Sequence, residues 1–132
     1  MSKHIVVIPG DGIGTEITDA AVEVLKKIDD IYKIGLTYEW KDAGGAAYDK
    51  FGEPLPQDTI DACKKADAIL FGAVGGDQWD HLEPSLRPEK AILGLRKALG
   101  LYVNLRPVKI QDSIARSQTS QAASVKTFLW YK

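Results

Sequence analysis

The sequence has very few of the side chains that staple or metallate small proteins. Among its 132 residues there is one cysteine, Cys63, and there are two histidines, His4 and His81. A single cysteine forms no disulfide within the chain, and neither histidine has a cysteine or histidine partner at ligand spacing. The composition therefore excludes disulfide scaffolds and zinc modules. His81, for which no Ser or Cys partner can be identified, is interpreted as a surface residue.

A basic excess and long hydrophobic runs are also absent. The 17 Lys and Arg side chains are balanced by 18 Asp and Glu, whereas binding to nucleic acid or to a membrane surface needs a surplus of positive charge. The apolar stretch 5–8 is too short for a secretory signal, and no run is long enough to span a bilayer. We therefore expect a cytoplasmic protein that binds neither nucleic acid nor membranes.

What the sequence does contain is a regular alternation of strand and helix patterns. Residues 3–8 form a continuous, largely β-branched run, which is typical of a strand buried on both faces of a parallel sheet. Further elements are predicted in the order helix from about 15 to 31, strand 36–40, helix from about 58, strand 68–74 and helix from 88 to about 99. This order predicts an α/β fold, a largely parallel sheet with flanking helices.

Two of the predicted helices have a recognisable start and an apolar face. In the first, Thr15 is a candidate N-cap, and apolar residues recur every three or four positions at 17, 20 or 21, 24, 28 and 31. In the second, Asp58 is predicted to cap the helix. Ile60 and Cys63 are predicted on its buried face, so Cys63 is interpreted as a core thiol.

The last part of the chain has a different character. Residues 101–110 favour a strand that Pro107 interrupts, which suggests an edge position. Residues 111–124 are mostly Gln, Ser, Thr and Ala without a period, as in a linker, and residues 125–132 are apolar but too few for an element with its own core. We therefore divide the chain into an α/β part, 1–110, and a low-complexity tail, 111–132.

Three glycines, Gly10, Gly12 and Gly14, separate the first strand from the first helix. Backbone N–H groups in such a turn can face an anion or a cofactor. The turn is not the full dinucleotide fingerprint, because a glycine at position 15 and a clear acidic residue at the end of the second strand are missing. A tight turn that lets the helix pack against the strand explains the glycines equally well.

The third helix places Glu89, Ile92, Leu93 and Arg96 on one face, because they are spaced i, i+3, i+4 and i+7. One interpretation is an ordinary helix that buries the two apolar residues and lets the charged ones reach water. The other is the wall of a ligand pocket, with an apolar patch beside a guanidinium that binds a carboxylate. Arg106, at the end of the next extended segment, is a candidate for a second such guanidinium.

Several motifs agree with one family when they are taken together. They are IPGDGIG at 8–14, GGAA at 44–47, FGEPLP at 51–56, GAVGG at 72–76 followed by Trp79, RPE at 87–89, LRK at 95–97 and NLRP at 104–107. In this order they resemble the 3-isopropylmalate dehydrogenases over residues 3 to 110. The wider family of decarboxylating β-hydroxyacid dehydrogenases includes isocitrate and tartrate enzymes.

The resemblance implies roles for individual residues. Arg96 and Arg106 match arginines that bind the malate carboxylates, and Ile92 and Leu93 match apolar positions that meet the isopropyl group. Glu89 matches an acidic residue between the substrate and the nicotinamide. The implied cofactor-bordering residues are Ile13, Gly76, Asp77, Gln78, Trp79, Asp80 and Glu89.

The activity implied by the resemblance is NAD-dependent oxidative decarboxylation of (2R,3S)-3-isopropylmalate in leucine biosynthesis, by a homodimer that uses Mg²⁺ or Mn²⁺. Ile92 and Leu93 favour this substrate over isocitrate, because burying a further carboxylate against them is costly. Two alternatives stay open. One is another decarboxylating dehydrogenase, of isocitrate or tartrate type, and the other is a non-catalytic module that binds a small acid or a nucleotide.

Parts of the family pattern have no counterpart in the sequence. The metal-binding Asp residues, a third substrate arginine and the Tyr and Lys that handle protons are missing, and Thr15 stands where the family has Pro. After about Lys109 the resemblance ends. We therefore expect a fold that is incomplete on its C-terminal side, with a sheet edge and apolar helix faces uncovered, and no turnover by the chain alone.

Overall fold

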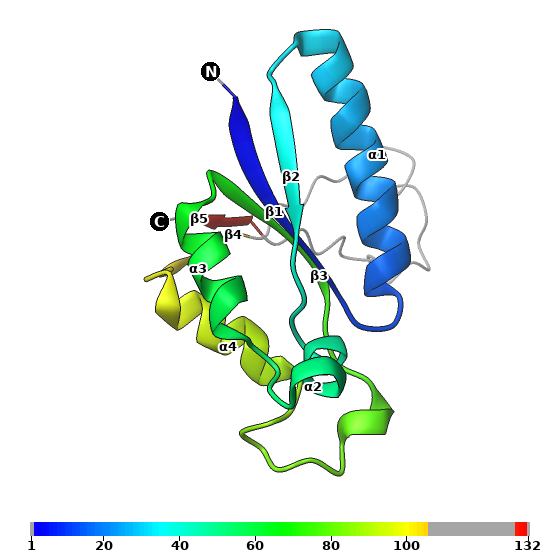
Figure 1. Ribbon diagram of the computed structural model, residues 1–132, viewed down its shortest axis with the longest axis vertical. Helices are drawn as coiled ribbons and strands as arrows, with labels where there is room; N and C mark the ends of the chain where they lie inside the picture. Colours follow the sequence, from blue (N-terminus) through cyan, green and yellow to red (C-terminus); the bar gives the residue numbers. More distant parts are fainter. Residues whose placement is uncertain (1, 106–128, 132) are drawn as a thin grey trace, which may run out of the picture. The chain divides into compact units, whose positions relative to one another are not determined.

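A computed structural model describes residues 2–105 and 129–131 of the chain (Figure 1). The elements are β1 (Lys3–Gly10), α1 (Gly14–Tyr32), β2 (Leu36–Trp40), α2 (Gly45–Phe51), α3 (Gln57–Lys65), β3 (Ala68–Ala73), the 3-10 helix η1 (Asp77–Trp79), α4 (Glu89–Ala98), β4 (Val103–Leu105) and β5 (Leu129–Tyr131). They form two compact units, Met1–Leu99 and Gly100–Lys132. Within the described residues, every helix is too short or too polar to cross a bilayer.

The first unit is built on the parallel sheet that the sequence predicts. Its strand order is β2-β1-β3, and both neighbours run parallel to β1, with Ile5 opposite Tyr38 on one side and Ala68 on the other. Val6, Val7 and Ile8 of the central strand have no exposed surface. A continuous apolar run is therefore what this strand needs, since both of its faces are covered.

Helix α1 packs on the sheet through a face other than the expected apolar one. Its buried residues are Gly14, Thr18 and Val22. Ile17 and Ile31 of the predicted stripe are instead 48% and 62% exposed. The predicted cap is also wrong, because the helix begins at Gly14 and no side chain caps its first turn.

Close approach explains why small residues form the contact between α1 and the sheet. A Cβ at Gly72 of β3 would overlap the Pro9 carbonyl oxygen and press on the Thr18 hydroxyl oxygen. The helix axis can lie this near the strands only where its side chains are short. Val22 and Leu25 of α1 pack against the core, whereas Ile17, Val24, Ile28 and Ile31 are left facing outward. These outward residues agree with the expectation of an uncovered helix face.

Two helices lie between β2 and β3, where the sequence predicts one. Residues 45–51, expected as part of a loop, form α2. Helix α3 begins at Gln57 with Pro56 at its N-cap, so Asp58 lies in the first turn and is not the cap. Thr59, Ala62 and Cys63 form its buried face, and Ile60 is only half-buried. The prediction that Cys63 belongs to the core is confirmed.

Helix α4 begins at Glu89, one residue after the predicted start, with Pro88 at its N-cap. In the second unit, β4 and β5 pair antiparallel, with Asn104 opposite Trp130. The strand expected over 101–110 is observed at 103–105, and its remaining part lies outside the described residues. The strand β5 was not expected from the sequence.

Candidate functional site

The ends of β1 and β3 meet at one edge of the sheet, where the turn 10–14 and the segment after Ala73 begin. Gly10 is paired with Ala73, and the Asp11 N–H donates to the Ala73 carbonyl oxygen over 2.6 Å. The carboxyl ends of parallel strands are where α/β proteins commonly bind ligands. This edge is therefore the candidate site.

The glycine turn uses its backbone groups mainly within the fold. The Gly14 N–H donates to the Asp11 carbonyl oxygen over 2.8 Å, and a Cβ at Gly10 or Gly14 would overlap the carbonyl oxygen of Ala73. The geometry thus supports the interpretation of a tight turn that allows close packing. Ile13, predicted beside the cofactor, projects from this turn and is 65% exposed.

Asp11 is the best-connected side chain at this edge, and the sequence analysis did not single it out. Its carboxylate is 4% exposed. Oδ2 accepts hydrogen bonds from the backbone N–H groups of Gly45 at 2.8 Å and Gly75 at 2.9 Å, and Oδ1 accepts one from Ala46 at 2.7 Å. The only sequence signal was an acidic residue between two glycines at a strand end.

Trp79 joins the segment after β3 to α2. Its indole Nε1–H donates to Asp49 Oδ1 over 3.0 Å, and its ring lies over Gly45, where a Cβ would overlap it. Trp79 is 7% exposed. Among the predicted cofactor-bordering residues, Trp79 therefore has a packing role. The other members of that loop, Gly76, Asp77, Gln78 and Asp80, are exposed.

The loop between η1 and α4 is closed by Arg87, another residue that the sequence analysis did not identify as structural. Its guanidinium donates to the carbonyl oxygens of Asp80 at 3.0 Å and Leu82 at 3.2 Å. Pro88 next to it is buried. The loop therefore reaches the start of α4 in a defined conformation.

Helix α4 packs through residues other than the predicted apolar pair. Ala91 and Leu95 are its buried residues, whereas Ile92 is half-buried and Leu93 is 52% exposed. The interpretation of α4 as an ordinary helix that buries both Ile92 and Leu93 is therefore wrong. An exposed leucine beside a half-buried isoleucine is an apolar surface available for a contact.

The start of α4 lies against the end of β3. A Cβ at Gly75 would be 2.8 Å from the Glu89 carboxylate oxygen Oε1, so Glu89 contacts the same segment that Asp11 binds. Arg96, about two turns further along the same face of the helix, is half-buried. Arg106 lies outside the described residues, so the predicted pairing of the two arginines stays a prediction.

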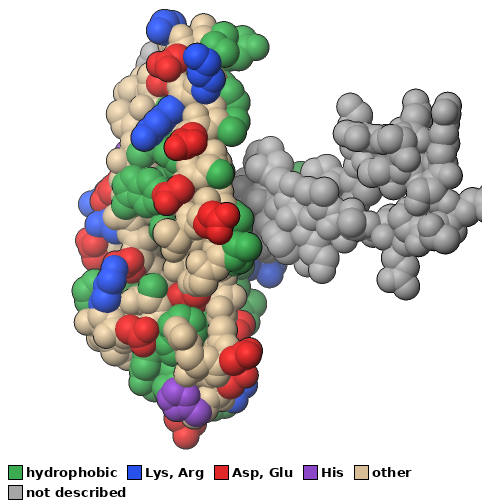
Figure 2. Space-filling view, turned by 90° about the vertical axis from the view of Figure 1, so that its right-hand side faces the viewer, with side chains coloured by type: hydrophobic (Ala, Val, Ile, Leu, Met, Phe, Trp, Pro, Cys, Tyr) green, Lys and Arg blue, Asp and Glu red, His purple; other side chains and the backbone are tan. Residues whose placement is uncertain are grey.

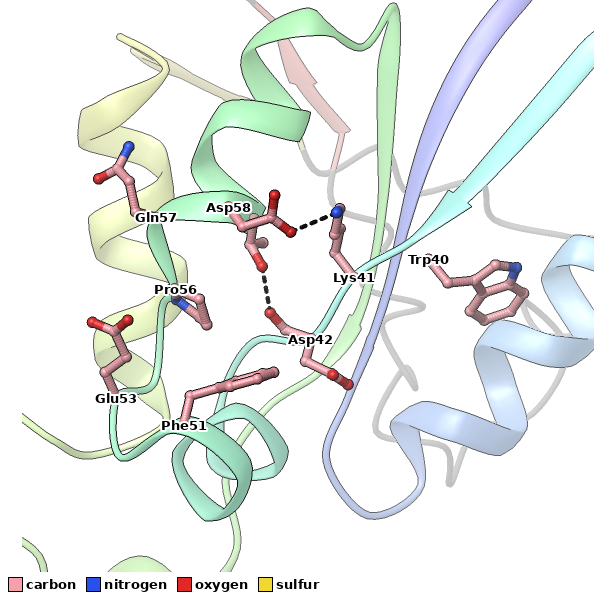
Figure 3. Close-up of a pocket in the computed structure, with 9 residues that line it drawn as sticks. Trp40, Lys41, Asp42, Phe51, Glu53, Pro56, Gln57 and Asp58 are labelled. Carbon is pink, nitrogen blue, oxygen red and sulfur yellow. Dashed lines mark hydrogen bonds and ion pairs between the residues drawn. The ribbon is translucent and has the colours of Figure 1, made fainter.

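A separate surface hollow of about 500 Å³ lies between the end of β2, α2 and α3, and none of the predicted site residues lines it (Figure 3). Two of its charged side chains pair with each other, with Lys41 Nζ 2.6 Å from Asp58 Oδ2, and Lys41 Nζ is also 3.0 Å from Glu39 Oε1 on β2. The hydrogen bond to Asp58 is the largest cause that raises the pKa of Lys41, and the hydrogen bond to Glu39 is the second. Thr59 Oγ1 donates to the Asp42 carbonyl oxygen over 2.8 Å. We interpret this region as a structural junction.

Neither a metal centre nor a thiol nucleophile is found in the part of the chain that the structure describes. That part contains no group of three or more His, Cys, Asp or Glu side chains arranged to hold a metal ion. Burial raises the pKa of the Cys63 thiol to about 11, so the thiolate is scarce at neutral pH.

Comparison with known proteins identifies the family. The model of the isocitrate/isopropylmalate dehydrogenase family matches residues 4–129. The chain belongs to this family. The match continues beyond Lys109, where the resemblance was expected to end.

Several members of the isocitrate/isopropylmalate dehydrogenase family are similar to this chain in both sequence and structure. The 3-isopropylmalate dehydrogenases of Halalkalibacterium halodurans and Oceanobacillus iheyensis are 55% and 56% identical over 121 and 114 residues, which are 90% and 86% of this chain and 33% and 31% of theirs. A β-decarboxylating dehydrogenase from Thermococcus kodakarensis matches in structure with a TM-score of 0.64 and 37% identity, over 78% of this chain and 28% of its own. An isocitrate dehydrogenase from Methylococcus capsulatus matches with a TM-score of 0.55 and 35% identity, over 77% and 27%. The chain thus spans about a third of the length of the curated relatives it matches.

Proposed function

We propose that this chain is the N-terminal part of an NAD-dependent 3-isopropylmalate dehydrogenase, and that α4 contributes the surface that selects the substrate. The observation that supports this most is the outward position of Leu93 and the partial exposure of Ile92 on a helix whose core contacts are made by Ala91 and Leu95. Apolar residues that a helix does not need for packing are suited to contact an apolar ligand group. The similarity to enzymes that bear this name supports the same substrate.

In this proposal each residue of the α4 face has one role. Ile92 and Leu93 contact the isopropyl group, and Arg96 binds a malate carboxylate, with Arg106 as its partner. A bidentate guanidinium holds a carboxylate in a fixed orientation. A substrate with a third carboxylate in place of the isopropyl group would lose hydration against the apolar pair without gaining a partner, which disfavours isocitrate.

Ile13, Glu89 and the exposed residues 76–78 and 80 fit the border of a nicotinamide cofactor, since the hydrogen bonds of Asp11 and the contact of Glu89 with Gly75 bring their segments to one edge. When bound, NAD supplies the acceptor for a hydride. The described residues do not supply a site for Mg²⁺ or Mn²⁺, so we assign no residue to a metal ion. The proposed setting is leucine biosynthesis in the cytoplasm, in a homodimer.

A completed chimera tests this proposal. Residues 1–105 are joined to the whole part of the Halalkalibacterium halodurans relative that follows the position matching residue 105, so that the position of Arg106 is kept, and kcat/KM is measured with isopropylmalate, malate and isocitrate. Replacing Leu93 by Ala removes apolar contact with the branched group, so we expect kcat/KM for isopropylmalate to fall about tenfold or more, at about 0.8 kcal/mol per buried CH₂. The value for malate should change less than twofold.

The variant Lys90→Ala is the control, because Lys90 is an exposed residue of α4 outside the face formed by residues 89, 92, 93 and 96. It should leave kcat/KM unchanged for isopropylmalate, malate and isocitrate. Equal effects of Leu93→Ala on isopropylmalate and malate, or a preference of the chimera for isocitrate, would contradict the proposed substrate. The unextended chain, assayed with isopropylmalate, NAD and Mg²⁺, should give no NADH above background.

A further inference from the structure

The buried Asp11 carboxylate connects three parts of the first unit that are far apart in sequence. It lies at the end of β1, and its oxygens accept hydrogen bonds from the first turn of α2 and from Gly75, the residue that starts the loop toward α4. We infer that Asp11 is a positioning residue, which fixes the Gly75–Gly76 loop and α2 in the arrangement needed to bind the cofactor. The inference about the ligand rests on the proposed function, whereas the inference about the loop does not.

The chemistry of the contact requires a carboxylate. Both oxygens act as acceptors, and three N–H groups offset the loss of water around a side chain that is 4% exposed. An amide in the same place would present an NH₂ group to at least one backbone N–H. That N–H would be left without an acceptor, and an unsatisfied buried donor destabilises the native position of the segment that carries it.

The surrounding residues are shaped to fit this carboxylate. Gly44 has φ +83°, and a Cβ there would be 2.5 Å from Asp11 Oδ2 and 2.8 Å from Val74 Cγ1. The next residue, Gly45, lies under the Trp79 ring, and Trp79 in turn binds Asp49 of α2. The loop after β3 is thus held at Gly75 by Asp11 and at Trp79 by α2.

The position of Gly75 matters because it determines what lies beside Glu89. The Glu89 carboxylate contacts Gly75, and Gly76 and η1, which follow directly, carry exposed residues predicted to border the cofactor. A displaced Gly75 would move these groups together. Loss of the Asp11 contact should therefore affect cofactor binding more than its effect on overall stability explains.

Amide hydrogen exchange in the wild-type chain is the first test. The N–H groups of Gly45, Ala46 and Gly75 should exchange at least tenfold more slowly than those of Asp77 and Gln78, although all lie outside the sheet. In Asp11→Asn at least one of the three should exchange tenfold faster. Asp67→Asn is the matched control, because Asp67 also accepts a backbone hydrogen bond, from His4 at 2.8 Å, but at the opposite end of the strands. It should change these three rates less than twofold.

Wild-type rates for the three amides equal to those of Asp77 and Gln78 would overturn the inference. Should Asp11→Asn fail to fold, the comparison is made with Gly44→Ala, whose Cβ would displace the same carboxylate oxygen. Fast exchange in that variant confined to residues 44–46 and 75 supports the inference, and unchanged rates overturn it.

NAD titration of the completed chimera, with and without the substitution, separates this inference from the proposed function. If both hold, the Kd for NAD rises at least tenfold in Asp11→Asn and less than twofold in Asp67→Asn. Equal NAD affinity in the wild type and Asp11→Asn, despite faster loop exchange, would overturn the positioning role. A completed chimera that binds no NAD would count against the proposed function, while the exchange rates would still decide whether Asp11 fixes the loop.

Discussion

At the scale of single residues, the glycines of the turn 10–14 serve two different purposes. Gly14 has an ordinary φ, but a Cβ there would overlap backbone atoms of Pro9 and Ala73, which cannot move aside without shifting the sheet. Gly12 has φ +52° and no atom within 4 Å of the place a Cβ would take. We expect Gly14→Ala to lower the free energy of unfolding by about 3 kcal/mol, and Gly12→Ala by about 1 kcal/mol.

Urea unfolding at pH 7 measures both glycine variants, with the wild-type chain as reference. The difference between them is the informative quantity, because both add the same methyl group. Equal losses would show that close packing at Gly14 is not the reason for the glycine. A cofactor role for the turn would then need to be considered again.

Cys63 provides a second test at this scale. Burial raises the pKa of its thiol to about 11, so the folded chain keeps the proton up to that pH while the unfolded chain loses it near 8.5. The contribution of the neutral thiol to stability is complete below about pH 8.5 and is lost as the pH rises toward 11. The urea midpoint of the wild type should therefore fall between pH 8.5 and 11, and that of Cys63→Ala should fall less.

The carboxylate of Asp11 shows why the site could be only partly predicted from the sequence. That the candidate residues of α4 share one face of the helix followed from their spacing, which needs only local information. The N–H groups that donate to the Asp11 carboxylate come from residues 34, 35 and 64 positions away in the chain. No local period contains such a contact, so a residue of this kind is found only when the strands and loops are placed in space.

At the scale of elements, the same limitation explains the face of α1. The period of its apolar residues predicted the helix correctly, since periodicity depends on the helix itself. Which side faces the sheet depends on how near β1 and β3 lie, and this favoured Gly14 and Thr18 over the larger Ile17. Helix α2 was missed because it has only seven residues, too few for a periodic pattern to be distinguished from a loop.

Lys41 joins two elements, because it binds Glu39 on β2 and Asp58 on α3. Hydrogen bonds from Lys41 and then from His4 lower the pKa of Glu39, so the ionised carboxylate stabilises the fold above its usual pKa and this contribution is lost as the pH falls through the lowered value. We expect Lys41→Met to lower the urea midpoint at pH 7 and to make the decrease between pH 6 and pH 3 smaller.

The control for Lys41 is Lys64→Met, since Lys64 pairs at 4.0 Å with Asp61 of the same helix, α3. Its midpoint should change little at either pH. A pH profile of Lys41→Met that is parallel to that of the wild type would mean that the pair between β2 and α3 contributes nothing measurable.

At the scale of the whole molecule, the apolar face of α1 determines how the chain behaves in solution. Ile17, Val24, Ile28 and Ile31 recur along a 19-residue helix and are 36% to 62% exposed. Figure 2, which views the α1 side, shows hydrophobic side chains at the surface among charged ones. A stripe from Ile17 to Ile31 spans about 21 Å of helix and favours association with another apolar surface. We therefore expect the purified chain to self-associate.

The double variant Ile17→Glu, Ile31→Glu tests whether the α1 stripe is responsible. Both positions are exposed, so the fold should be retained, while the dissociation constant measured by sedimentation should rise at least tenfold because apolar area is removed from the contact. Lys27→Glu changes the net charge by the same two units and removes no apolar residue, so it separates the loss of apolar contact from charge repulsion. If Lys27→Glu weakens association as much as the double variant does, charge repulsion is the cause. A wild-type chain that stays monomeric would show that the stripe does not promote association.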